Sequence, residues 1–191
     1  MTVEPGQRRP LIIRLTIVAL VAVLLQIVAV SQITFLQASA DLLPLVVAAV
    51  GLLCGSMPGA VFGFGLGLFG DVAGYQLVGL SSLAYLAVGF WAGRLRELRD
   101  PQAPTVPMAV GAVATLGSTL AIGLMRLLLG IEVPASADGL RAIASMTVLN
   151  ALIAIPVFSL VRRALAPALP DQRRRRRRSY TTGGLSPLSR P

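Results

Sequence analysis

The sequence predicts an all-α membrane protein with six short transmembrane helices, and three observations support this fold class. Hydrophobic residues make up 55% of the 191 residues, with a mean hydropathy of +0.78. Charged residues make up only 13%, about half the share typical of a soluble domain. Long apolar runs alternate with short arginine-containing segments, which is the pattern of a chain that crosses a bilayer several times.

The first membrane helix is expected at residues 11–30. No charged residue occurs between Leu15 and Ala40, and about twenty apolar residues suffice to cross the hydrocarbon core. The preceding residues 1–10 form a short polar lead that contains Arg8 and Arg9. Because arginines concentrate in cytoplasmic segments, we expect the N-terminus to be cytoplasmic.

Residues 42–93 contain a single charged residue, Asp71, and then Arg94, Arg96 and Arg99 follow closely. These arginines indicate a second cytoplasmic segment, so the chain must cross the membrane an odd number of times between the first helix and Arg94. Glycine and proline at 55–59 and glycines at 74–79 supply two breaks. The sequence therefore predicts three helices at 42–54, 58–72 and 79–95. The first two of them are short enough to need shielding by neighbouring helices.

The last two membrane helices are expected at 106–128 and 140–161. Asn150 lies near the middle of the final helix, where we expect it to form interhelical hydrogen bonds, and Pro156 is expected to kink that helix. In the fifth helix the expected packing face contains Gly111, Thr115, Thr119 and Ile122. The transmembrane domain then spans 11–165, with both termini and every arginine except Arg126 and Arg141 in the cytoplasm.

The C-terminal residues 166–191 form an arginine-rich tail whose composition predicts disorder. Six consecutive arginines fix the orientation of the chain and bind anionic lipids, each contributing about 1 kcal/mol near a membrane surface. Binding to nucleic acid is the less favoured interpretation. These residues are Arg173, Arg174, Arg175, Arg176, Arg177 and Arg178.

Glycines recur at every fourth position as Gly55, Gly59, Gly63 and Gly67. On a helix they form one smooth face, here called the glycine stripe, which another helix can approach closely. Asp71 continues this stripe. A carboxylate there must face protein or water, because the lipid core does not solvate a charge.

Asp71 has two interpretations. In the structural one it caps the end of its helix, bonded to backbone N–H groups near Gly74 or paired with Arg126 or Arg141. In the functional one it fixes a surface for a partner or a small molecule. On the following helix, Ser81, Tyr85 and Gly89 share one face with Gly93, which is more typical of packing than of a binding site.

The composition also argues against an enzyme. The chain has no histidine and all of its 17 basic residues are arginine, so it lacks an imidazole base, a Ser-Lys pair and a His-rich metal site. Residues 65–70 match the pattern GxGxxG, but that fingerprint requires a strand and a soluble βαβ unit. We therefore expect no catalytic residue, no cofactor and no metal.

Three segments together resemble the rod shape-determining protein MreD family: GFGLGLFGD at 63–71, GLSSLAYL at 79–86 and AGRL at 92–95. The resemblance implies a six-helix fold like that of the substrate-binding subunits of energy-coupling-factor transporters. It implies a non-catalytic component of the cell-elongation complex in the bacterial inner membrane, supporting peptidoglycan synthesis. The direct partner would be MreC, and indirect partners MreB, RodA and a class B penicillin-binding protein. The arginine-rich tail has no counterpart in the family core.

The resemblance places Asp71, Gly79 and Tyr85 on family positions, and it suggests that the glycine-lined faces of the third and fourth helices dock MreC. The alternative is a substrate-binding membrane subunit of an energy-coupling-factor vitamin transporter. Such a subunit needs several convergent polar side chains. The sequence offers few at the outer side, which makes this alternative the less favoured one.

Overall fold

The computed structural model describes residues 5–30, 34–35, 38–39, 41–75, 77–98, 105–131 and 137–168. Six α-helices make up nearly all of this part of the chain. Their bounds are α1 Pro5–Leu25, α2 Leu42–Cys54, α3 Ser56–Ala73, α4 Leu80–Leu98, α5 Thr105–Leu128 and α6 Ala137–Leu165. A π-helical turn, η1 (Gln26–Val30), continues α1, and a 3-10 turn, η2 (Ala166–Ala168), follows α6.

The all-α membrane fold is confirmed. Four helices, α1, α3, α5 and α6, are long and apolar enough to cross a membrane, and α2 is a shorter apolar helix. The α2 bounds agree with the prediction at both ends, because Asp41 before it and Gly55 after it are strong boundary signals. At Gly55 the backbone has φ of +102°, a left-handed conformation that glycine adopts without strain.

The structure differs from the predictions at both ends of the first membrane helix. The polar lead expected at 1–10 is helical from Pro5, since the proline occupies the first turn, where its missing N–H costs nothing. Beyond the helix, β1 (Thr34–Phe35) pairs antiparallel with β2 (Ala38–Ser39). These strands of two residues each were not predicted, because they are too short to produce an alternating pattern.

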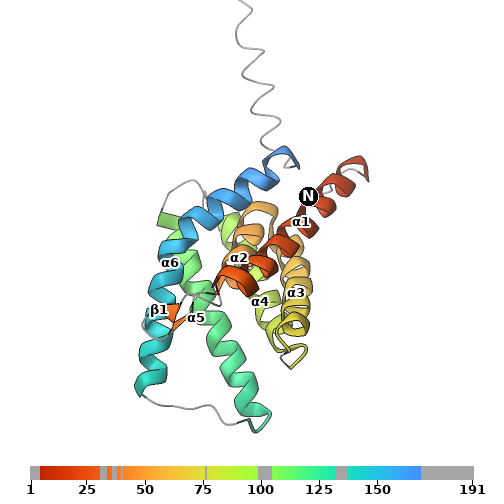
Figure 1. The fold of residues 1–191 in the computed structure, drawn as a ribbon. Coiled ribbons are helices and arrows are strands. Elements are labelled where there is room, and N and C mark those ends of the chain that lie inside the picture. Colours follow the sequence, from red (N-terminus) through yellow and green to blue (C-terminus); the bar gives the residue numbers. More distant parts are fainter. Residues whose placement is uncertain are drawn as a thin grey trace, which may run out of the picture.

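The helices pass back and forth between two ends of a bundle. The beginning of α1 and the end of α6 lie at one end, uppermost in Figure 1. The turn between α3 and α4, the end of α5 and the start of α6 lie at the other end.

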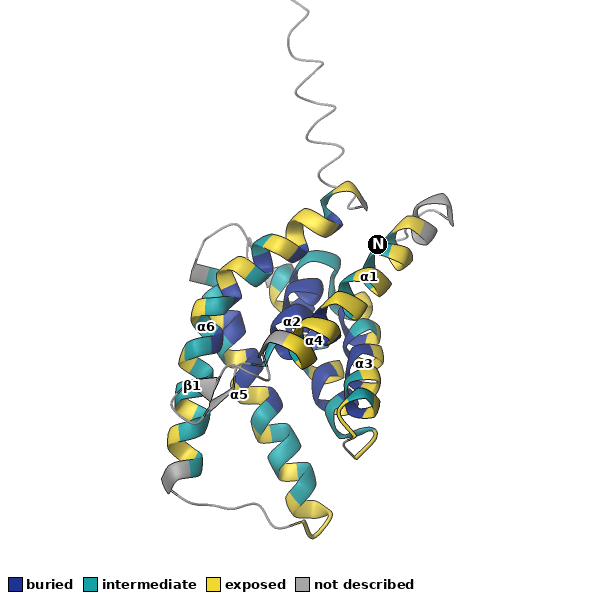
Figure 2. Cartoon of the chain, viewed as in Figure 1, coloured by how far each residue is buried: buried dark blue, intermediate teal, exposed yellow. Residues whose placement is uncertain are grey.

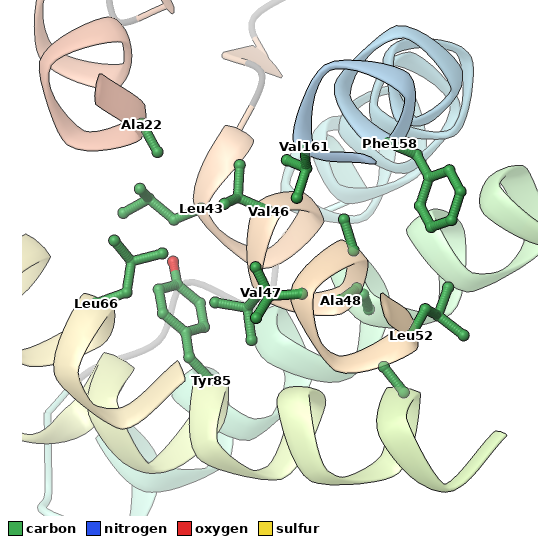
Figure 3. Close-up of a cluster of buried hydrophobic side chains, with 14 of the residues drawn as sticks. Ala22, Leu43, Val46, Val47, Ala48, Leu52, Leu66, Tyr85, Phe158 and Val161 are labelled. Atoms are coloured by element: carbon green, nitrogen blue, oxygen red, sulfur yellow. The ribbon is translucent and has the colours of Figure 1, made fainter. Parts of the chain in front are cut away.

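Helix α2 occupies the centre of the bundle. Every residue from Leu43 to Leu52 is buried, and Figure 2 shows this helix almost entirely in the colour for buried residues. The side chains of α2 itself are mostly leucine, valine and alanine on every side of the helix, as expected for a helix without a lipid-facing or water-facing side. In Figure 3, Val46 and Val47 of α2 lie among side chains of other helices, including Leu66 and Val161.

Three of the four glycines of the stripe, Gly59, Gly63 and Gly67, lie inside the bundle, where α3 packs against α4. Gly55 was wrongly expected on the same helix, since its left-handed backbone ends α2 just before α3 begins. A β-carbon added at Gly59 would lie 2.5 Å from the carbonyl oxygen of Gly89, and one at Gly67 would lie 2.6 Å from the backbone of Ser82. A β-carbon at Gly63 would collide with the carbonyl oxygen of Tyr85. The backbones therefore touch, which only glycine allows.

This packing corrects the expectation that the glycine-lined faces of the third and fourth helices dock a partner. Gly59, Gly63 and Gly67 face Ser82, Tyr85 and Gly89 of the same chain. The stripe is a structural contact between α3 and α4 and leaves no room for another helix.

Two arginines tie helix ends together at the end of the bundle where the chain begins. Arg14 of α1 donates to the carbonyl oxygen of Ala164 in α6 at 2.7 Å. Arg96 of α4 donates to the carbonyl oxygen of Leu53 in α2 at 2.6 Å. Both carbonyls belong to last helical turns, which have no intrahelical partner and carry partial negative charge. The cations therefore satisfy atoms that lipid could not.

Two neighbouring glycines of α3 provide a test of the packing. Gly63→Ala should lower the free energy of unfolding by about 1–3 kcal/mol, because the new methyl group forces the two backbones apart. Gly65→Ala should instead be neutral or raise it by up to about 1 kcal/mol, since nothing lies within 4 Å of a β-carbon there. Thermal unfolding of the purified variants in detergent measures both effects. Equal effects at the two positions would contradict the backbone contact.

Candidate functional site

Asp71 links the end of α3 to the beginning of α4. Its side chain is 2% exposed. One carboxylate oxygen, Oδ2, accepts hydrogen bonds from the backbone N–H of Gly79 at 2.8 Å and of Ser81 at 3.3 Å. Helix α4 begins at Leu80, so the first amide belongs to the residue just before the helix and the second to its first turn. Asp71 therefore closes the turn between the two helices.

The role of this carboxylate is to cap α4 from the neighbouring helix. The first N–H groups of a helix have no intrahelical acceptor, and a side chain at the N-cap position normally supplies one. Here that position is Gly79, which has no side chain and whose φ of +106° favours glycine. Asp71 supplies the missing oxygen, and its negative charge is favoured by the helix dipole.

This geometry supports the structural interpretation of Asp71, with different partners from those expected. The bonds go to Gly79 and Ser81 rather than to the region of Gly74 or to Arg126 or Arg141. The sequence could not identify these partners, because they depend on how the turn at 74–79 folds back. Of the two other residues that the resemblance singles out, Gly79 shapes the turn and Tyr85 lies in the core.

A second polar cluster, here called the Asp41 network, joins α2 to three other helices. The Asn150 side chain donates to the backbone carbonyl of Asp41 and to the hydroxyl of Thr115, both at 3.0 Å. It accepts from the backbone N–H of Asp41 at 3.2 Å. The Asp41 carboxylate accepts from the N–H of Leu43 at 3.1 Å and from the hydroxyl of Tyr85 at 3.1 Å. Figure 3 shows this hydroxyl in the core, close to α2.

The Asp41 network confirms the prediction that Asn150 forms interhelical hydrogen bonds. Asn150 is completely buried, and both protons of its amide group are used within the network. Thr115 donates in turn to the carbonyl of Gly111 at 2.9 Å. Since the polar groups satisfy one another, the network acts as a structural tie at the beginning of α2 rather than as an open ligand site.

Sequence reasoning missed two members of this region. Asp41 was not named as a site residue, although an aspartate just before an apolar run is a recognised N-cap signal. Gln26 accepts from the backbone N–H of Leu42 at 2.8 Å. Its position as a lone amide in the apolar first helix was a usable signal, because polar side chains in membrane helices usually have partners within the protein.

The remaining predicted positions divide into packing residues and residues outside the described chain. Gly89 is buried against Gly59. Ser81 is half-buried at the start of α4, and the hydroxyl of the neighbouring Ser82 is buried without a hydrogen-bond partner. The backbone of Ser82 lies against Gly67, where there is no room for a β-carbon. The tail arginines 173–178 lie outside the described residues.

Comparisons with protein-family models, with curated proteins and with solved structures find no match to this chain. Within the described ranges, no group of three histidine, cysteine, aspartate or glutamate side chains is placed to hold a metal ion. The function must therefore be argued from the chain's own residues.

Substitutions of Asp71 test the capping role. Asp71→Ala should lower the free energy of unfolding by about 2–4 kcal/mol, because two N–H groups lose their acceptor in a buried turn. Asp71→Asn keeps one carbonyl oxygen and should lose less than half as much. Thermal unfolding and the yield of folded protein measure the effect. If Asn and Ala are equally damaging, the charge rather than the hydrogen bonds is what matters.

A double-mutant cycle tests the Asp41 network. Thr115→Val removes one hydroxyl, and Asn150→Leu removes the amide at nearly the same volume. The two changes together should cost less than the sum of the single changes, with a coupling energy of about 0.6–1.7 kcal/mol for a membrane hydrogen bond. Thr119→Val, one turn further along α5, is the control and should show no coupling. Additive costs for Thr115 and Asn150 would contradict the hydrogen bond.

Proposed function

We propose that this protein is a non-catalytic membrane component of the bacterial cell-elongation complex that docks MreC and thereby supports peptidoglycan synthesis and cell shape. The proposal rests on the resemblance to the MreD family. It includes location in the inner membrane with both termini in the cytoplasm. The clustering of Arg14, Arg96, Arg162 and Arg163 at one end of the bundle favours that orientation.

The observation that supports the proposal most is that the residues of the family-like segments shape the contact and the turn between α3 and α4. Gly63 and Gly67 allow backbone contact between α3 and α4. Asp71 and Gly79 form the cap and the turn that join these helices. These positions therefore specify a rigid helical hairpin. A sequence pattern whose members all fix the shape of one unit is expected of a protein that works by holding a partner.

Because the glycine stripe is buried, the docking surface must lie elsewhere. The outer face of α3 is the best candidate. Val61, Gly65, Leu68 and Val72 are exposed and follow one another at helical spacing. Because Gly65 has no side chain, it leaves a depression on this face into which the backbone of a partner helix can pack closely, as at other membrane helix contacts. We propose that the single transmembrane helix of MreC packs along this face.

Paired glycine substitutions test the docking face. Gly65→Leu should leave the protein folded, since nothing lies within 4 Å of a β-carbon there, and it should reduce co-purification with MreC at least tenfold. Gly117→Leu on α5 is the matched control, because Gly117 is also exposed and has no neighbour within 4 Å of a β-carbon. Co-expression followed by affinity purification in mild detergent provides the measurement.

The outcomes separate the docking face from the function itself. Normal MreC binding by both variants would exclude the α3 face while leaving the complex intact. No binding of MreC by the unaltered protein would exclude the proposed function. Loss of binding by both variants would show that the effect is not specific to α3.

A further inference from the structure

The end of the bundle where α1 begins and α6 ends gathers three arginines from the first and last helices. The Arg14 side chain reaches the carbonyl oxygen of Ala164 at 2.7 Å. The two residues before Ala164 are Arg162 and Arg163, whose side chains are both exposed. Val161 and Leu165 on either side are buried. The last turn of α6 is therefore fixed by its apolar face and presents its arginines outward.

These arginines have hydrogen-bonding capacity that the described chain does not use. A guanidinium group carries five N–H donors, and Arg14 donates one hydrogen bond, to the carbonyl oxygen of Ala164. Arg162 and Arg163 make no hydrogen bond or ion pair within the described residues. The two carboxylates whose side chains are described, Asp41 and Asp71, are bonded elsewhere in the bundle. The charges of Arg14, Arg162 and Arg163 are thus not neutralised by a carboxylate of the described residues.

The position of Arg14 along the apolar span of α1 indicates what kind of anion could bind there. The apolar span of α1 begins at Pro10, so Arg14 lies about 6 Å along the helix from that boundary. Its guanidinium must extend back toward the membrane surface, as arginines near the ends of membrane helices do. Arg162 and Arg163 lie likewise close to the end of the apolar span of α6, which ends at Leu165, so all three guanidinium groups can reach lipid headgroups.

Exposed aliphatic side chains occur within one helical turn of these arginines along the chain. On α1 these are Ile12, Ile13 and Ile17, and on α6 Leu160. A ligand bound at the junction of α1 and α6 could contact the guanidinium groups with one end and branched apolar side chains with the other. A phospholipid with a negatively charged headgroup has this combination of phosphate and acyl chain, and a soluble anion has only the first.

We propose that the junction of α1 and α6 is a binding site for one anionic phospholipid, whose phosphate is held by Arg14, Arg162 and Arg163. The arginine fork binds phosphate oxygens in a bidentate manner, and the acyl chains lie along α1. The lipid would bridge the first and last helices, which the Arg14 bond to Ala164 already joins. This site does not depend on the proposed function.

The test compares two pairs of substitutions that remove the same charge. Arg162→Gln with Arg163→Gln should weaken binding of phosphatidylglycerol to the full chain by roughly twentyfold, about fivefold for each arginine at a membrane surface. Arg126→Gln with Arg141→Gln, at the opposite end of the bundle, should change it less than twofold. Native mass spectrometry of the detergent-solubilised protein, titrated with phosphatidylglycerol or phosphatidylcholine, measures the binding. The tail is present in every variant, so its contribution cancels.

Two further measurements test the arginine fork and the kind of anion that binds. Arg14→Lys preserves the charge but not the fork, and it should weaken phosphatidylglycerol binding severalfold while thermal unfolding stays cooperative. Inorganic phosphate at millimolar concentration should not displace the lipid. Equal losses in the two glutamine pairs, unchanged binding in Arg162→Gln with Arg163→Gln, or displacement by phosphate would each overturn the site.

Discussion

The contact on which the structure depends is the meeting of two backbones along α3 and α4. In a bilayer, no hydrophobic effect pushes helices together, so close packing and hydrogen bonds must hold them. Gly59, Gly63 and Gly67 allow the main chains to touch over most of their length. The cap that Asp71 gives to α4 then fixes the turn between them. The result is a hairpin against which the buried helix α2 can pack.

The sequence predicted the helices well because each membrane crossing is a long apolar run with clear ends. The bounds of α2 were correct because Asp41 and Gly55 mark them. The direction in which a helical face points was not predictable, since a glycine stripe serves equally well inside a chain or between chains. Asp71 shows the same limit. Its position predicted a buried partner, but which amide it meets depends on the folded turn at 74–79.

Polar groups within the bundle follow a single rule. Asn150 bonds to Thr115 and to the backbone of Asp41, and Tyr85 bonds to the carboxylate of Asp41. An unpaired polar group surrounded by apolar atoms would cost several kcal/mol. Among the described residues, the hydroxyl of Ser82 is an exception, since it is buried without a hydrogen-bond partner. It lies in α4 at the point where the backbone of Ser82 contacts Gly67 of α3.

Most buried polar groups of the described bundle are hydrogen-bonded to one another. Binding of a partner or a lipid would therefore use the outer surfaces of the helices. The outer face of α3 is attached to the most closely packed unit of the fold, so a helix docked there would be held in a fixed position relative to α2. The arginine end of α1 and α6 would set the depth of the whole bundle in the bilayer, because guanidinium groups remain at the level of the headgroups. Together these surfaces could place a partner helix at a defined height and orientation, which is the physical requirement for a membrane scaffold.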